Sequence, residues 1–269
     1  MFSSLQNLYR YRVLIRTLVA RELKARYRGS ILGFFWSFFN PLLLLTVYTI
    51  VFNYILPNRS ADTQPYALFL FCGLLPWTWF SSSLLECSNV IIIGGSLIKK
   101  IVFPAEVLPF VSVLANMVHF LLGTPILLLF ILIFKVPLSW FGLYFPVIIF
   151  IQLIMTLGFG LWISSLSVHF RDLRDILANL LTLWFFSSPV IYPFKVSFIE
   201  DPNTVSKVFK YVLYLNPVSY LMDSYHQSIF YGRMPDIRHL GIVFGFSLLV
   251  FFTGYFLFDR LRDTFAEEV

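Results

Sequence analysis

Long apolar runs separated by short polar segments dominate the pattern of the chain. A helix needs about 20 mostly apolar residues to cross the hydrocarbon of a membrane, because each residue adds about 1.5 Å. Six runs approach or exceed that length, at about 34–56, 66–88, 107–134, 143–168, 176–194 and 240–258. They are continuous, without the period-two alternation of barrel strands, so they predict helices. We expect an all-α integral membrane protein whose six transmembrane helices form one domain, residues 1–269.

The segment 10–28, before the first run, has a two-sided pattern. Its apolar residues fall near one helical face, and these are Leu14, Ile15, Leu18, Val19 and Leu23. Its basic residues fill much of the rest, and these include Arg12, Arg16, Arg21 and Lys24. Such a helix is too polar to span and is typical of a membrane surface. A solvated helix that only orients the protein is the alternative.

The segment 195–239 is too apolar for a free loop and too broken for two further spans. It begins with polar residues and becomes apolar at 211–215. Asn216 and Pro217 then fit the cap and first turn of a helix that Gly232 would end. We expect two short re-entrant helices that dip into the outer leaflet, with a small folded cap as the alternative.

Composition strengthens the membrane assignment. Hydrophobic residues make up 58% of the 269 residues and charged residues 13%, whereas soluble domains carry about 25% charged residues. The excess apolar surface is therefore expected to face lipid. The net charge of +6 is not gathered on one soluble face, which favours membrane lipids over nucleic acid as the partner.

The basic residues also predict the orientation. Six spans would place both termini on one side of the membrane. Most of the 20 Lys and Arg residues fall on that side, namely those before Phe34 and those at 99–100, 171–174 and 260–262. Because basic loops stay inside, we expect a multi-pass protein of the cytoplasmic membrane with both termini in the cytoplasm.

The predicted cytoplasmic loop 89–106 contains a candidate docking surface. Ser96 is suited to cap a short helix, Lys99 and Lys100 favour the C-terminal end of that helix, and Pro104 would stop it. A short helix with one apolar and one basic side can bind a soluble partner. A plain positive-inside anchor remains the alternative.

Candidate chemistry is sparse. The chain has no GxxxxGK[ST] loop for phosphate, its four histidines lack metal spacing, and no compact catalytic group is evident. We therefore expect no enzyme activity and no cofactor bound by this chain. Gly158-Phe159-Gly160 lies within a span and favours helix packing over dinucleotide binding.

The few polar residues inside the spans are candidates for a functional role. His119 lies with Asn116 near the middle of the third span, where it would line a cavity or bond a neighbouring helix. Glu86 lies near the cytoplasmic end of the second span. It would reach interfacial water or an arginine of the basic helix. A continuous chain of Asp and Glu residues, as proton-driven transport needs, is not seen.

Aromatic residues gather in the first and fifth spans. The first carries Phe34, Phe35, Trp36, Phe38, Phe39, Tyr48, Phe52 and Tyr54, and the fifth carries Trp184, Phe185, Phe186 and Tyr192. Aromatic rings hold the apolar faces of sugars weakly, and a channel for a polymer needs many weak contacts. The alternative is the ordinary aromatic belt of a membrane protein together with lipid-facing Phe.

Five motifs, in order, give the chain a resemblance to bacterial polysaccharide ABC-transporter permeases, which export O-antigen, capsule and teichoic acid. They are Arg26-Tyr27-Arg28-Gly29-Ser30-Ile31-Leu32-Gly33-Phe34-Phe35-Trp36 with Asn40-Pro41; Leu97-Ile98-Lys99-Lys100 with Phe103-Pro104, Glu106 and Pro109; His169-Phe170-Arg171-Asp172-Leu173; Ser188-Pro189-Val190-Ile191-Tyr192; and Leu215-Asn216-Pro217. Each motif is weak alone, but together they cover nearly the whole chain.

The resemblance implies two copies of this chain with two nucleotide-binding ABC ATPase subunits, which would hold ATP and Mg²⁺. It implies that the ATPase docks on a loop and its neighbours, here Leu97, Ile98, Lys99, Lys100, Phe103, Pro104, Arg171 and Asp172. It implies a channel between the copies along the first and fifth spans, here Phe35, Trp36, Phe39, Tyr48, Phe52, Trp184, Phe185 and Tyr192.

The substrate that the resemblance implies is a lipid-linked, O-antigen-like polysaccharide. It would enter from the cytoplasmic side beside the basic helix, whose arginines Arg21, Arg26 and Arg28 would contact its pyrophosphate. A permease of the same architecture for a drug or lipid is the first alternative. A polytopic glycosyl- or acyltransferase is the second, and it would need a group of acids, histidines or metal ligands at one membrane face.

Overall fold

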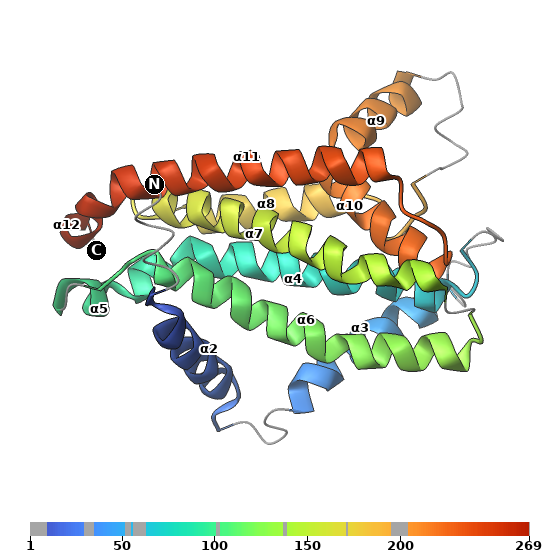
Figure 1. The fold of residues 1–269 in the computed structure, drawn as a ribbon, viewed down its shortest axis with the longest axis horizontal. Coiled ribbons are helices and arrows are strands. Elements are labelled where there is room, and N and C mark those ends of the chain that lie inside the picture. Colours follow the sequence, from blue (N-terminus) through green and yellow to red (C-terminus); the bar gives the residue numbers. More distant parts are fainter. Residues whose placement is uncertain are drawn as a thin grey trace.

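The computed structural model describes residues 10–29, 35–51, 55, 63–100, 103–136, 139–170, 172–194 and 204–268. Within these ranges the regular structure is helical, as the apolar pattern predicts. Four helices are long and apolar enough to cross a membrane: α4 (Tyr66–Ile93), α6 (Val107–Ile133), α7 (Phe145–Ser167) with the preceding 3₁₀ turn η4 (Trp140–Tyr144), and α11 (Ile237–Leu261). They run side by side along the long axis (Figure 1) and correspond to the second, third, fourth and sixth expected spans.

The helices at the first and fifth expected spans are shorter. They are α3 (Trp36–Ile50) and α8 (Leu173–Phe186), of 15 and 14 residues. At about 1.5 Å per residue each is about 22 Å long, which is less than the hydrocarbon thickness of about 30 Å. Residues 34, 52–54 and 56 of the expected first span lie outside the described ranges, so the length given for α3 is that of its described part.

The expectation that the fifth span continues as a helix to Phe194 is wrong. Helix α8 ends at Phe186, and residues 187–190 form a turn in which the amides of Ser187 and Ser188 bond to the carbonyls of Leu183 and Phe185. Pro189 follows directly and has no N–H to continue the helical bonding. The chain therefore bends away at the position where the apolar run alone predicted further helix.

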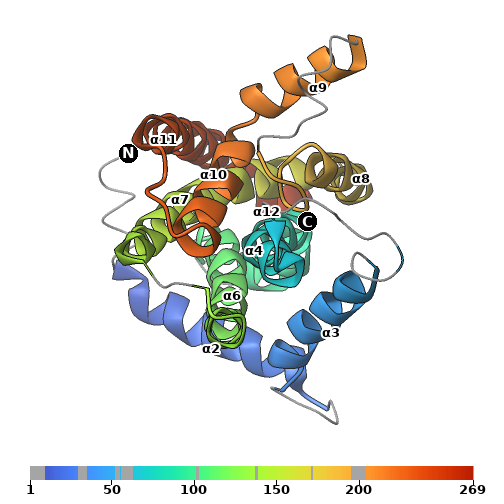
Figure 2. The same ribbon diagram turned by 90° about the vertical axis from the view of Figure 1, so that its right-hand side faces the viewer.

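Helix α4 forms the centre of the bundle, with α3, α6, α7 and α8 around it (Figure 2). All residues from Tyr66 to Trp77 are buried. In its most apolar window 78% of residues are buried, against 33% for the corresponding windows of α6 and α11. The apolar side chains of α4 thus contact protein, whereas large parts of α6 and α11 are free to face lipid.

Helices α7 and α11 approach each other closely at two glycines. A Cβ atom on Gly158 would lie 2.6 Å from the backbone nitrogen of Phe251, and one on Gly254 would meet the carbonyl of Gly158. Small residues permit such backbone contact between membrane helices. The interpretation of the Gly158 segment as helix packing is confirmed.

The two ends of the bundle carry different short helices. At one end, the α5 end, lie α5 (Gly95–Lys100) and α12 (Phe265–Glu268), which follows the turn η7 (Arg262–Thr264) and packs against α5. The amphipathic α2 (Arg12–Tyr27) crosses α6 obliquely near this end (Figure 1). Its five apolar-face residues are half-buried and its basic ones are exposed, as the sequence predicts.

The opposite end, the α10 end, contains the segment expected to be re-entrant. Helix α9 (Thr204–Leu215) projects away from the bundle, whereas α10 (Pro217–Tyr225) and the π-helical turn η6 (His226–Phe230) pack against α4 (Figures 1 and 2). Gly232, at φ +58°, follows η6 and ends the helical segment. The two expected helices are therefore present between 204 and 230.

Candidate functional site

An ion pair joins the amphipathic helix to the centre of the bundle. The Nη2 atom of Arg26 on α2 lies 2.6 Å from Oε1 of Glu86 on α4. The prediction that Glu86 reaches an arginine of the basic helix is thereby confirmed. The side chains keep 27% and 33% of their surface exposed, so solvent and headgroups can still reach the pair.

Asn116 on α6 completes a three-residue ring with this ion pair. Its Oδ1 accepts a hydrogen bond of 3.1 Å from Arg26, and its Nδ2 donates one of 2.7 Å to the second carboxylate oxygen of Glu86. Nδ2 also donates to the carbonyl of Ser112, 3.0 Å away. Both carboxylate oxygens are thus occupied, and three different helices are tied together at one point. We call Arg26, Glu86 and Asn116 the charged ring.

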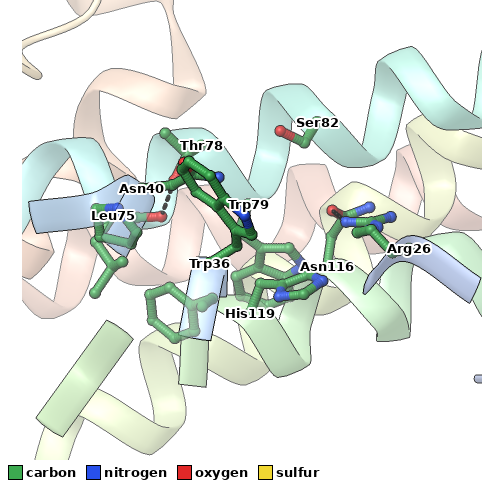
Figure 3. A pocket seen from close by; sticks show the side chains of 11 residues that line it. Arg26, Trp36, Asn40, Leu75, Thr78, Trp79, Ser82, Asn116 and His119 are labelled. Carbon is green, nitrogen blue, oxygen red and sulfur yellow. Dashed lines mark hydrogen bonds between the residues drawn. The ribbon is translucent and has the colours of Figure 1, made fainter. Parts of the chain in front are cut away.

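Two cavities adjoin the charged ring, and Arg26 and Ser82 line both. The first, of 440 Å³, lies between α2, α3, α4 and α6, and its polar residues include Asn40, Thr78 and His119. Figure 3 shows Trp36, Trp79 and His119 gathered on one side of Arg26 and Asn116. His119 lines this cavity, which is one of the two roles expected of it.

The second cavity, of 680 Å³, opens on the other side of the charged ring. Its charged residues come from α2, α4 and the start of α8, and they are Arg21, Glu22, Arg26, Glu86 and Arg174. Two of the three arginines expected at the substrate entrance, Arg21 and Arg26, therefore line it. The third, Arg28, is exposed directly after α2.

Sequence reasoning missed that the polar residues of two helices form facing stripes. Thr78, Ser82 and Glu86 repeat every four residues on α4, and Ser112, Asn116 and His119 repeat at helical spacing on α6. Residues at such spacing share one face of a helix. That periodicity was the signal available in the sequence, and it predicts a polar seam between the second and third spans.

The expected docking residues lie at the α5 end. Lys99 and Asp172 are exposed, whereas Leu97, Ile98, Phe103 and Pro104 are partly buried, and Ile98 and Phe103 pack beside a cluster that contains Phe265 of α12. The cavity lined by Leu97 also reaches Arg174, so the two expected docking loops adjoin. Arg171 and the Lys100 side chain lie outside the described residues. An ATPase contact stays a prediction.

One detail of the docking loop is corrected. Helix α5 begins at Gly95, so Ser96 lies in its first turn and is not its cap. The carbonyl of Gly94 instead accepts the amides of Leu97 and Ile98 at 2.9 and 3.1 Å. Glycine is tolerated at such a helix start, and Gly94 also lets the side chain of Leu108 approach.

Helices α3 and α8, which carry several of the expected channel residues, both lie to the right of α4 in Figure 2. On α3, Phe35 and Phe39 are exposed, Tyr48 is half-buried and Trp36 lines the 440 Å³ cavity. Phe52 lies outside the described residues. Exposed aromatic rings are compatible with a lipid face as well as with a channel wall, so the lining role stays a prediction.

On α8 and beyond, the expected channel residues make fixed contacts. The indole of Trp184 donates to Oδ1 of Asn216, 2.9 Å away, and packs edge-on to Phe80. Phe185 packs against Trp77, and the hydroxyl of Tyr192 donates to the carbonyl of Phe186. These three rings are half-buried. Their role in lining a channel also stays a prediction.

The α10 end is held by neutral hydrogen bonds. Asn216 caps α10 by accepting the amide of Val218 at 3.0 Å, which confirms the predicted cap. The hydroxyl of Tyr225 donates to Gln152, which in turn donates to the carbonyl of Pro76. A ring nitrogen of His226 lies 3.1 Å from the carbonyl of Phe69. Sequence reasoning did not single out Gln152, Tyr225 or His226.

Comparisons with known proteins identify the relatives of this architecture. Residues 13–230 match the family described as ABC-2 type transporter. The O-antigen export system permease protein RfbA of Myxococcus xanthus is 40% identical over 270 residues, covering 100% of both chains. Its namesake from Klebsiella pneumoniae is 29% identical over 257 residues, covering 94% of each.

A more distant relative is named for the transport of a different polysaccharide. The polysialic acid transport protein KpsM of Escherichia coli is 24% identical over 262 residues, again covering 94% of each chain. The similarity to these transporters runs from the amphipathic α2 through the apolar helices to the α10 end. The chain belongs to the ABC-2 type transporter family, and it is a membrane protein.

Proposed function

We propose that this chain is the channel-forming subunit of an ATP-driven exporter that moves a lipid-linked, O-antigen-like polysaccharide outward across a bacterial cytoplasmic membrane. The observation that carries the proposal is the full-length similarity, at 40% identity, to a protein named as an O-antigen export permease. We assign nucleotide hydrolysis to separate ABC ATPase subunits, because the relatives from Myxococcus xanthus and Klebsiella pneumoniae are named as permeases.

The proposed assembly contains two copies of the chain and two ATPases. Each copy crosses the membrane six times, with α3 and α8 as parts of the first and fifth spans and both termini in the cytoplasm. The α5 end then faces the cytoplasm, and the basic residues near it support this orientation. The α10 end faces outward, and α10 and η6 form its re-entrant segment.

The polar seam between α4 and α6 supports an entrance for an anionic headgroup. Arginines bind phosphate through paired hydrogen bonds, and Arg21 and Arg26 line a 680 Å³ cavity beside α2. The headgroup enters there, and the sugar polymer follows along aromatic residues of α3 and α8. ATP-driven motion reaches the spans through α5.

Loss of the gene in its host tests the proposal. We expect surface polysaccharide to disappear and the polymer to accumulate inside the cell, since synthesis continues without export. Immunoblots of intact and lysed cells measure both pools, and a plasmid copy of the wild-type gene restores the surface pool. Unchanged surface polysaccharide, with loss of a drug-efflux phenotype instead, would contradict the proposal and favour a permease for small molecules.

A further inference from the structure

The charged ring holds α2 to the bundle through one guanidinium. Arg26 donates to Glu86 at 2.6 Å and to Asn116 at 3.1 Å, while Asn116 and Glu86 are bonded directly to each other at 2.7 Å. The polar link between α4 and α6 therefore does not need Arg26, but the polar links from α2 to both helices do. A ligand that took over the hydrogen bonds of Arg26 would break the polar links of α2 and leave the Asn116–Glu86 bond between α4 and α6 in place.

The position of the ring lets a ligand reach that guanidinium. Arg26 lines the cavities of 440 and 680 Å³ on both sides, and neither member of the ion pair is fully buried. Glu86 and Glu22 are the acids that line the larger cavity, against the cations Arg21, Arg26 and Arg174. Glu86 thus neutralises a cation that would otherwise face an open, basic cavity.

A carboxylate and a phosphate compete for the same face of an arginine. The planar guanidinium fork bonds either group through two parallel N–H donors, and a phosphate brings more charge and more acceptor oxygens. A ring made only for rigidity would not need a charge, because neutral bonds hold the α10 end. The charge at the accessible position therefore points to exchange with an anion.

Building on the proposed function, we propose that Glu86 is an internal counter-ion which the phosphate headgroup of the lipid-linked substrate displaces from Arg26, and that this exchange releases α2 from α4. The resting protein keeps Arg26 paired and the two cavities separated by the ring. The loaded protein has the headgroup on Arg26 and α2 detached. In this scheme Glu86 is a positioning residue, which pairs with Arg26 only while the headgroup is absent.

Binding to the full chain in phosphatidylcholine nanodiscs tests the exchange. The probe is farnesyl pyrophosphate, and the fluorescence of Trp36 and Trp79 beside the cavity reports its binding. Because Glu86 competes with the probe, Glu86→Gln should bind it at least about tenfold more tightly, and Arg26→Gln at least about tenfold more weakly. Arg26→Lys, which keeps the charge but not the fork, should fall between wild type and Arg26→Gln.

A matched control comes from another ion pair. Arg262 and Asp259 lie 3.1 Å apart at the end of α11, and Asp259→Asn also removes one carboxylate from an arginine. Its affinity for the probe should equal that of wild type. Equal affinity in Glu86→Gln and wild type would overturn the proposal, and so would equal affinity for inorganic pyrophosphate and the farnesyl probe, since the headgroup would then need no lipid.

Hydrogen exchange on the wild-type chain gives an independent readout that a merely structural pair would not change. Saturation with the probe should speed amide exchange in α2, and Glu86→Gln should show faster exchange before the probe is added. Slower exchange in α2 on binding would overturn the release. If the purified chain fails these tests but cells need the gene to export polysaccharide, the proposed function stands and only the counter-ion mechanism is rejected.

Discussion

Helix α4 passes through two different surroundings along its length. From Tyr66 to Trp77 every residue is buried against α10, η6, α7 and neighbouring helices. From Ser82 onward the helix borders cavities and joins the charged ring. We call the part of the bundle around Tyr66–Trp77 the closed half and the part from Ser82 onward, where the charged ring meets its two cavities, the hollow half. Cavities of 460 and 300 Å³ also border the closed half, but the described residues that line them carry no charge.

The two halves also satisfy their polar groups differently. In the closed half, Gln152 and Tyr225 are fully buried and bond to each other at 2.7 Å without any charge. In the hollow half, a charged pair sits where solvent reaches it. Neutral bonds between membrane helices contribute about 0.6 kcal/mol each on average, whereas an unpaired charge in hydrocarbon costs several kcal/mol.

This contrast in polar contacts indicates which half of the bundle is able to change shape. Neutral buried bonds have no competitor inside a dry core, so they hold one arrangement. A charged pair beside a cavity has competitors in water and in any anionic ligand. We infer that shape changes concentrate near the α5 end and that the α10 end stays fixed, and the predictions below test that division.

The largest effect is expected from volume added to the closed half. In Gly73→Val the new Cβ would lie 2.5 Å from the carbonyl oxygen of Val190 and 3.1 Å from His226. A backbone atom cannot move aside, so we expect the free energy of unfolding to fall by about 3 kcal/mol or more. Aggregation of the variant would be visible on size-exclusion chromatography.

Gly241→Val is the matched control, because the Cβ there meets nothing within 4 Å. It also lies near the α10 end, on α11, and should leave the elution profile and melting temperature unchanged. A monodisperse, stable Gly73→Val protein would show that this half is not tightly packed and would contradict the division into a closed and a hollow half.

A smaller effect, on function alone, is expected at the α5 end. Lys99 is exposed on α5, and the double change Lys99→Glu, Lys100→Glu reverses the charge that the ATPase is proposed to meet. We expect ATPase activity coupled to the permease to fall about fivefold or more, with membrane insertion intact. ATP hydrolysis in proteoliposomes and membrane fractionation measure the two quantities.

Lys207 and Lys210 on the exposed α9 provide a control for charge alone. The double change Lys207→Glu, Lys210→Glu alters net charge equally at the other end and should keep coupled activity. Equal losses in both double variants would contradict the docking assignment of α5.

The smallest effect is expected at the exposed start of α11. The amide of Arg238 donates to Asp236 at 2.8 Å, and this bond lowers the pKa of the Asp236 carboxyl below its ordinary value. A lowered pKa gives stability that is present above the ordinary value of about 3.9 and is lost as pH falls through the native value.

Asp236→Asn keeps a helix cap but removes the titration. The melting temperature of wild type should therefore fall more steeply between pH 5 and pH 3 than that of the variant, while the two agree at pH 7. Parallel curves over the whole range would show that this cap does not contribute to acid sensitivity.

Much of the fold was predictable because apolar runs report burial or lipid contact directly. The runs 66–88 and 107–134 match α4 and α6 closely, and 143–168 and 240–258 match the other long helices. The run at 176–194 predicted too long a helix, because hydrophobicity alone does not indicate the turn before Pro189. The same runs gave no sign that α4, and not α6 or α11, is central.

The site was predictable in part. Glu86 was expected to reach interfacial water or an arginine of the basic helix, because it lies near the cytoplasmic end of its span. That this arginine is Arg26 was not predicted. Asn116 as the third member depends on the rotation of α6 against α4, which apolar periodicity does not fix. The roles of Gln152 and Tyr225 could not be predicted, because their hydrogen-bond partners are backbone and side-chain atoms on segments far away in the sequence.

The backbone contact between α7 and α11 has a mechanical consequence. With no side chains at Gly158 and Gly254 to act as a cushion, the two helices cannot slide past each other without a steric clash. They form one rigid pair of helices. At one end of the pair α12 contacts α5, and near the other end α10 packs against both helices. A force applied at the α5 end would thus move α7 and α11 together as one body, without changing the arrangement within the α10 end.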